Sequence, residues 1–340
     1  MSMIAKQLLK KTIIAAMAAF GPQRWPFLHP RLLVLTYHRV LPENDPRYSL
    51  EQPGMVVTPE TFTRQLEWLA SAGFQFTHVS DWLSRTRQEA IPGKWCAITF
   101  DDGWQDNYEY AFPVLRTRNI PFEIYVVANR CDGIGDYWPG RLARALATMV
   151  TTRCDLTPLK DVDWLLELLP DGRLPSSADR NWIDRVVTVC KRHPESFIYP
   201  HLESLEQQLP SAPNDKRALL DEMELQAMLV TGLFQMGCHT ANHVRLLEQV
   251  NDQTLYEEVV TARAQLEQRF GTRVTSFCYP NGDYSPAALA LVRKHYACAV
   301  TTQTGWNTIK SDPFQLRRIS IHEDATNTPQ RFWAKVSGWL

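Results

Sequence analysis

The chain lacks three features that would each define a class of protein. It has no run of about 18 apolar residues, which excludes a conventional transmembrane helix. Its 36 Lys and Arg residues nearly balance its 37 Asp and Glu residues, so the charge gives no indication of a nucleic-acid partner. Its seven cysteines are odd in number and show no CxxC spacing. They therefore predict reduced, mostly buried thiols, and a reducing compartment.

Segments typical of strands and helices alternate from residue 31 onward. Apolar runs predict strands at 31–38, 74–79, 95–100, 121–128, 234–238, 274–279 and 296–301. Apolar spacing and capping residues predict helices at 58–72, 81–85, 107–118, 221–230, 252–270 and 285–295. This alternation predicts an α/β fold with a parallel sheet or barrel. Residues 131–218 break the alternation with helical stretches and several prolines, and they predict an inserted helical subdomain.

The first 30 residues form a basic amphipathic segment ahead of the main domain at 31–340. At helical spacing, Ile4 and Leu8 fall on one side, and Lys6, Lys10 and Lys11 fall on the other. Such a helix either lies on an anionic membrane or packs on its own domain, and the sequence leaves both open. We expect the protein to be cytoplasmic, with peripheral contact to the inner face of the cell membrane.

Two neighbouring carboxylates, Asp101 and Asp102, directly follow the predicted strand at 95–100. Far downstream, His239 and His243 follow the strand at 234–238. Because functional groups collect at the carboxyl ends of parallel strands, we expect these side chains to meet. One carboxylate and two imidazoles suit one divalent ion, with Zn²⁺ the best match. The sequence predicts that Asp102, His239 and His243 hold the ion and that Asp101 accepts a proton from water.

Other candidate residues complete a hydrolytic site. A backbone N–H in the turn that contains Pro280 and Asn281 is a candidate donor to an oxyanion. His38 and His322 are candidates for the general acid that protonates a departing amine. Trp306 has a flat apolar face suited to stacking on a sugar ring, although packing in the core is the alternative.

Three segments carry a resemblance to a known family. They are Thr99-Phe100-Asp101-Asp102, His239-Thr240-Ala241-Asn242-His243 and Phe277-Cys278-Tyr279-Pro280-Asn281-Gly282. In this order they resemble successive motifs of the polysaccharide deacetylases, the NodB-homology domains of carbohydrate esterase family 4. The stretch from Leu35 to Val40 is similar to the branch that contains the poly-N-acetylglucosamine deacetylases. The resemblance covers roughly residues 31–130 and 219–322.

The resemblance implies a distorted (β/α) barrel that removes N-acetyl groups from amino sugars. It implies Asp101 as base and His38 as general acid, and it places substrate contacts in Tyr279, Pro280 and Asn281. One departure concerns an arginine of the third motif that orients the base in many members. Cys278 stands at that position here, and we expect Arg317 or Arg318 to replace it.

These observations predict a metal-dependent N-deacetylase that acts on an N-acetylated amino sugar of a cell-envelope polysaccharide or glycolipid. One alternative is an O-acetyl esterase or deformylase that acts on a lipid-linked sugar. Another is a catalytically silent protein that binds glycans. A non-haem iron oxygenase also uses two histidines and one carboxylate, but it gives Asp101 no role.

Overall fold

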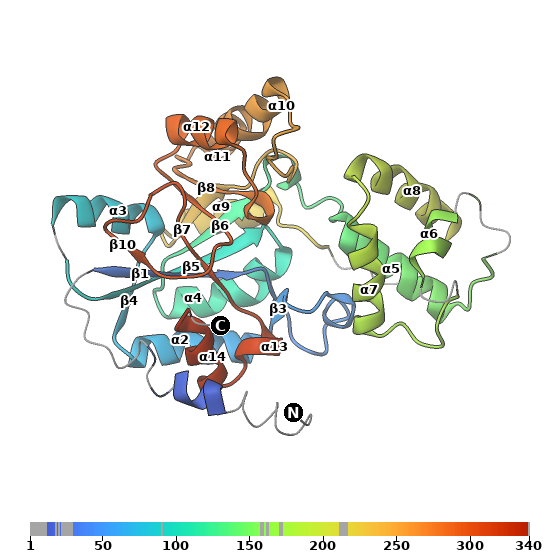
Figure 1. Cartoon of the computed structure of the whole chain (residues 1–340), viewed down its shortest axis with the longest axis horizontal. Coiled ribbons are helices and arrows are strands. Elements are labelled where there is room, and N and C mark those ends of the chain that lie inside the picture. The colour runs from blue at the N-terminus through green and yellow to red at the C-terminus, as the bar shows by residue number, and fades with distance from the viewer. Residues whose placement is uncertain are drawn as a thin grey trace.

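The computed structural model describes residues 12–17, 19, 21, 30–89, 91–156, 160, 163–169, 173–210 and 217–338. In these residues the chain forms a curled α/β body with a group of helices, α5 to α8, set to one side (Figure 1). No helix within the described ranges has both the length and the apolar character needed to cross a membrane.

Parallel strands make up most of the main sheet, whose order is β10-β1-β5-β6-β7-β8-β9. Strand β11 also pairs with β1, and strand β4 pairs with β5. Among the described strands of this sheet, only β1 and β10 pair in antiparallel fashion. Helices cover such sheets, which explains why the central strands are continuous apolar runs. The strands are β1 (Arg31–Tyr37), β4 (Phe74–Phe76), β5 (Lys94–Asp102), β6 (Phe122–Val126), β7 (Phe234–Cys238), β8 (Ser276–Cys278), β9 (Cys298–Val300), β10 (Asn307–Thr308) and β11 (Ile319–Ser320), beside a small pair of β2 (Arg39–Val40) and β3 (Val56–Val57).

The C-terminal segment curls the sheet toward closure. Leu316 forms a parallel bridge with Val300 at the end of β9. A few residues later, β11 pairs with Leu35 and Thr36 of β1. Residues 316–320 therefore connect β9, at one end of the sheet, to β1, near the other end. The resulting curled sheet with outer helices confirms the predicted distorted (β/α) barrel.

Helices begin and end largely where capping residues predict. Thr58 accepts a hydrogen bond from the Thr61 N–H ahead of α2, Ser285 accepts one ahead of α12, and Gly271 ends α11 with a φ of 62°. The helices of the body are α2 (Pro59–Ser71), α3 (Val79–Gln88), α4 (Phe112–Thr117), α9 (Glu222–Leu229), α10 (Asp252–Tyr256), α11 (Ala262–Phe270), α12 (Pro286–His295), α13 (Glu323–Thr326) and α14 (Pro329–Val336).

Two predicted helices contain a wider turn, and the predicted strands at 74–79, 274–279 and 296–301 are shorter than expected. Residues Asn107–Ala111 and Glu257–Thr261 are π-helical, a form common near functional sites. Strand β4 ends at Phe76, and Val79 already belongs to α3 because its N–H donates to the buried carboxylate of Glu123 at 2.6 Å. The prediction of a strand to Val79 is therefore wrong.

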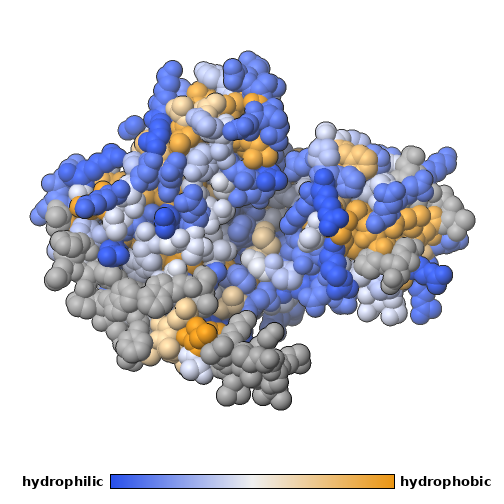
Figure 2. Space-filling view, in the orientation of Figure 1, coloured by the Kyte–Doolittle hydropathy of each residue, from blue (hydrophilic) through white to orange (hydrophobic). Residues whose placement is uncertain are grey.

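The segment at 131–218 forms helices with a core of their own. They are α5 (Trp138–Thr151), α6 (Asp163–Leu168), α7 (Arg180–Cys190) and α8 (Glu195–Gln208). Trp138, Leu146, Ile183 and Leu202 are buried members of this second core. Figure 2 shows apolar side chains at the surface of these helices, among polar ones. A small unit encloses its core less completely than a large one does, so some of its apolar surface stays exposed.

Most of the predicted basic amphipathic helix lies outside the described residues. Of that segment, residues 12–17 are helical, and Ile13 is exposed. Its contact with a membrane stays a prediction.

Candidate active site

Four neighbouring strands, β1, β5, β6 and β7, bring the central side chains together at their carboxyl ends. Asp102 is the last residue of β5 and pairs with Val126 of β6, which in turn pairs with Cys238 of β7. His239 directly follows β7, and its N–H donates to the carbonyl of Val126 at 2.9 Å. His38 directly follows β1, the neighbour of β5 on the other side. The strand pairing therefore places these groups together at the carboxyl ends of neighbouring strands, as the sequence predicts.

Asp102, His239 and His243 form a compact group of potential metal ligands. Their ligand atoms all lie within 4.8 Å of one another. Asp102 Oδ1 lies 3.5 Å from Nε2 of His239 and 3.5 Å from Nε2 of His243. Tetrahedral Zn²⁺ with bonds of 2.0–2.1 Å places its ligand atoms about 3.4 Å apart. The donor set and its spacing thus fit a divalent ion.

Each histidine offers Nε2 to this group. His239 Nδ1 lies 2.8 Å from the carbonyl oxygen of Cys278, which can only accept a hydrogen bond. Nδ1 of His239 therefore carries a proton, and Nε2 is the nitrogen directed at Asp102. Burial, together with neighbouring His239, lowers the pKa of His243 to about 4, so that this imidazole is neutral at pH 7.

The backbone at the ligands adopts conformations that non-glycine residues seldom take. Asp102, Thr240 and His243 have φ values of 74°, 66° and 66°. The buried carboxylate of Glu258 holds the histidine loop, because it accepts 2.9 Å hydrogen bonds from the N–H groups of Ala241 and Asn242. Such strained residues persist only where surrounding contacts fix them, and they cluster at functional sites.

Asp101 is bound on both oxygens by one guanidinium. Arg318 donates to Oδ1 and to Oδ2 of Asp101, each at 2.7 Å. Cys278 Sγ lies 3.1 Å from the same guanidinium. Of the two arginines that the sequence offers as replacements at the Cys278 position, the structure places Arg318 at the carboxylate, whereas Arg317 is exposed. Arg318 belongs to the C-terminal segment and directly precedes β11.

Both carboxylates stay ionised although they are buried. Burial by itself raises the pKa of Asp101, but the adjacent Arg318 outweighs it and holds that pKa below its usual value. Burial also raises the pKa of Asp102, but His239 and His243 outweigh it and lower the net value. Asp101 is therefore a carboxylate that can accept a proton at neutral pH.

Of the two candidate acids, His38 belongs to the electrostatic surroundings of both carboxylates. The charge of His38 contributes to the lowered pKa of Asp101 and of Asp102. His322 lies at the same edge of the sheet, after β11, but the charged groups that act on it are Asp324, Lys335 and Arg180. Nδ1 of His38 and Nδ1 of His322 are both buried, and neither has a hydrogen-bond partner within the described part of the chain.

The predicted substrate contacts divide into two groups. The turn after β8 lies at the edge of the site, with Asn281 exposed at a φ of 55° and Pro280 buried. The side chain of Tyr279 points into the core, where its hydroxyl donates to the carbonyl of Phe314 at 3.2 Å. Only the backbone of this turn, and the Asn281 side chain, are therefore available to a substrate.

Trp306 lies away from the site. It precedes β10, which pairs with the first residues of β1, at the end of that strand opposite to His38. Its Nε1 donates to the carbonyl of Val336 at 2.8 Å, and its ring packs 5.9 Å from that of Phe74. The prediction that Trp306 contacts a sugar at this site is corrected: it is a packing residue beneath the C-terminal helix.

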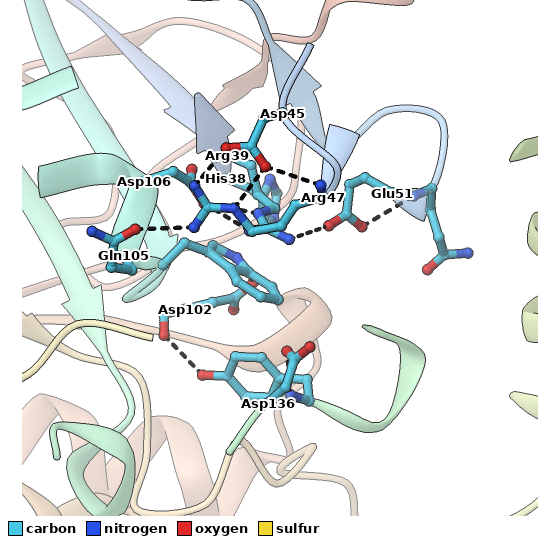
Figure 3. A network of polar contacts seen from close by, with 12 residues as sticks. His38, Arg39, Asp45, Arg47, Glu51, Asp102, Gln105, Asp106 and Asp136 are labelled. Atoms are coloured by element: carbon cyan, nitrogen blue, oxygen red, sulfur yellow. Dashed lines mark hydrogen bonds and ion pairs between the residues drawn. The ribbon is translucent and has the colours of Figure 1, made fainter. Parts of the chain in front are cut away.

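The sequence analysis did not identify a group of buried charged side chains beside the site. Arg39 donates to Asp106 at 2.9 Å and to Glu51 at 2.7 Å, and Asp45 binds Arg47 (Figure 3). Arg39 and its partners are far apart in the sequence, and no spacing pattern links them. The only signal was the composition of the segment that follows His38, which is rich in charged residues.

Fold and site together define a class: a curled α/β barrel with two histidines and one carboxylate beside a second, arginine-bound carboxylate. A family model described as polysaccharide deacetylase matches residues 88–152 and 205–299. These segments contain Asp101, Asp102, His239 and His243. The chain therefore carries a polysaccharide deacetylase domain, and the resemblance in the motifs is confirmed.

Curated relatives match only part of this chain. Poly-beta-1,6-N-acetyl-D-glucosamine N-deacetylase from Staphylococcus epidermidis is 32% identical over 105 residues, which cover 28% of this chain and 36% of that protein. The protein of the same name from Staphylococcus aureus is 26% identical over 114 residues, which cover 32% of this chain and 39% of that protein. The matches thus span little more than a third of these relatives.

Solved structures match nearly the whole chain. IcaB from Ammonifex degensii superposes with a TM-score of 0.57 at 21% identity, over 90% of this chain and 97% of that one. The deacetylase PplD of Streptococcus pyogenes, solved with acetate, gives a TM-score of 0.56 at 17% identity, over 89% and 97%. At such identities the likeness establishes the shared fold.

The triad predicts the metal content of the protein. Wild-type protein should contain about one divalent ion per chain, and His243→Ala should lose it because one of three donors is removed. Elemental analysis of the two purified proteins measures this directly. His193→Ala, in the turn between α7 and α8, is the control and should retain the ion. Wild-type protein that stays metal-free after reconstitution would contradict the assignment.

Proposed function

We propose that the protein is a metal-dependent N-deacetylase that removes acetyl groups from an N-acetylated amino sugar of a cell-envelope polysaccharide or glycolipid. The proposal rests on one observation: two neighbouring carboxylates at the end of β5 have different partners. Asp102 faces the two histidines, whereas neighbouring Asp101 faces Arg318. One carboxylate is thereby available to a metal and the other to a proton.

A divalent ion, which we propose to be Zn²⁺, would be held by Asp102, His239 and His243. When bound, such an ion supplies a Lewis acid that polarises the acetyl carbonyl and makes water more acidic. Asp101 takes the proton of the attacking water on a carboxylate oxygen. Arg318 fixes both oxygens of Asp101, so that the base is held in one orientation before substrate arrives.

We assign the remaining steps to other residues beside the two carboxylates. A backbone N–H in the turn of Pro280 and Asn281 would donate to the developing oxyanion. Amide cleavage also requires a proton on the departing nitrogen, because an amine anion is a poor leaving group. His38 is the candidate donor, because it directly follows β1 beside the end of β5, where both carboxylates lie.

The names of the relatives indicate which substrates to test. The staphylococcal relatives are named as N-deacetylases of poly-beta-1,6-N-acetyl-D-glucosamine. We therefore propose oligomers of β-1,6-linked N-acetylglucosamine as the first substrate class. Release of acetate from them by the metal-loaded wild-type protein tests the function. No release from these oligomers, or from other N-acetylated glycans, would overturn it.

Substitution of the base separates metal binding from catalysis. Asp101→Asn should lower kcat by roughly 100- to 10,000-fold, because the amide cannot accept the proton of water. The metal content should stay unchanged, because Asp101 is not a ligand. Acetate release and elemental analysis on the same samples provide both readouts. Asp163→Asn, at the exposed start of α6, is the control, and retained activity in Asp101→Asn would exclude Asp101 as base.

The two histidines differ in their expected effects. His38→Ala should lower kcat on the amide substrate by about 100-fold or more with the metal retained, whereas His322→Ala should leave kcat near the wild-type value. Hydrolysis of 4-nitrophenyl acetate needs no general acid, so His38→Ala should lose little activity on that ester. An equal loss on both substrates would argue against the acid role.

We also propose that the basic N-terminal segment attaches the protein to the cytoplasmic face of an anionic membrane. The support is the separation of Ile4 and Leu8 from Lys6, Lys10 and Lys11 around a helix. Each lysine near an anionic surface contributes about 1 kcal/mol of attraction.

Deletion of residues 2–20 tests this attachment. The shortened protein should no longer sediment with phosphatidylglycerol vesicles, while its activity on soluble oligomers is unchanged. A variant with Lys6, Lys10 and Lys11 replaced by Glu should behave in the same way, because it removes the charge and keeps the length. Vesicle binding that survives both changes would exclude the segment as the anchor.

A further inference from the structure

The two oxygens of the Asp102 carboxylate have different partners. Oδ1 faces Nε2 of His239 and of His243, at 3.5 Å from each. Oδ2 accepts a hydrogen bond from the indole N–H of Trp104 at 3.0 Å. We propose that Trp104 is a positioning residue that makes Asp102 a one-oxygen ligand and so strengthens divalent-ion binding. The inference rests on the proposed function, because it concerns the same metal site.

Contacts on its ring fix the direction of the Trp104 N–H. The guanidinium carbon of Arg39 lies 4.2 Å from the centroid of the indole, a cation–π distance. The ring of Tyr137 meets the indole edge to face, with centroids 5.3 Å apart. Trp104 is itself buried, in a small apolar cluster with Tyr137 and Leu219. The indole therefore has little freedom to turn its N–H away from Asp102.

Two carboxylates fix the guanidinium of Arg39, which stacks on the Trp104 ring. Asp106 and Glu51 bind its guanidinium from two directions (Figure 3), and the side chain of Asp106 is fully buried. A second hydrogen bond joins Asp106 Oδ1 to the N–H of Val40 at 2.7 Å. The buried charges that the proposed mechanism does not use thus support the residue that orients Asp102.

The main chain of Asp102 has a separate support. The hydroxyl of Tyr137 donates to the carbonyl oxygen of Asp102 at 2.8 Å. This contact stabilises the unusual φ of Asp102, whereas Trp104 acts on the side chain. Removal of the indole N–H should therefore free the carboxylate to rotate while the backbone stays in place.

A free carboxylate would bind the ion less well and in a different geometry. Without a donor on Oδ2, both oxygens can turn toward the ion, and the pre-set one-oxygen arrangement is lost. Removal of hydrogen-bond partners that orient metal ligands lowers metal affinity by about 10- to 100-fold in other sites. The same range is expected here.

Trp104→Phe is the central experiment, because it removes the N–H and keeps an aromatic ring for Arg39 and Tyr137. Its affinity for Zn²⁺, measured by competition with a chromophoric chelator, should fall by about 10- to 100-fold. The absorption spectrum of the Co²⁺-loaded protein should change, since it responds to coordination number and geometry. Trp82→Phe is the matched control. Trp82 is equally buried, but its indole nitrogen has no hydrogen-bond partner among the described residues.

The outcomes distinguish this inference from the proposed function. If Trp104→Phe binds Zn²⁺ as tightly as wild type and gives the same Co²⁺ spectrum, the inference fails and the metal site stands. If wild type and His243→Ala bind Zn²⁺ equally, or neither binds it, the proposed function itself fails. If Trp104→Phe does not fold, a benzothienyl analogue of tryptophan at position 104 replaces it, because this analogue keeps the fused rings and lacks only the N–H.

Discussion

The buried pair of Arg318 and Asp101 is the interaction on which the rest of the site depends. Beyond its two bonds to Asp101 on β5, Arg318 donates to the hydroxyl of Thr36 on β1 at 2.8 Å and to the carbonyl of Thr301 after β9 at 3.0 Å. One guanidinium thus ties three strands to the C-terminal segment that curls the sheet. Removing one member of a buried ion pair leaves the other charge unpaired, at a cost of about 3–5 kcal/mol. Arg318 therefore both orients Asp101 and helps to close the barrel.

Two of the three side chains that we propose to hold a metal ion, by contrast, lie on strained backbone. Asp102 and His243 both occupy the left-handed region, which each non-glycine residue enters at a cost of about 1–3 kcal/mol. Glu258 and Tyr137 offset that strain by hydrogen bonds to the main chain on either side of the site. Because both supports are buried, they hold these side chains in place, as the proposed ion site would require.

The inserted helices have their own core, yet they contact the charged segment beside the site. Arg180 of α7 donates to the carbonyl oxygens of Glu51 and Gln52, at 2.6 Å and 2.9 Å. Glu51 in turn binds Arg39, which stacks on Trp104. Tyr137, the residue before α5, reaches Asp102 from the same subdomain. The insertion is therefore part of the structure that holds Asp102.

The sequence alone determined the α/β alternation, the helical character of 131–218 and the residues that meet at the strand ends. These features depend on local periodicity and on the rule that parallel strands end at one edge, so they are readable without coordinates. The tertiary structure decided the rest. It shows that Arg318, and not Arg317, binds Asp101, and that Trp306 packs away from the site. It also shows that Arg39 stacks on Trp104, which donates to Asp102. Such choices depend on contacts between residues far apart in the chain, and no spacing in the sequence encodes which of them will touch.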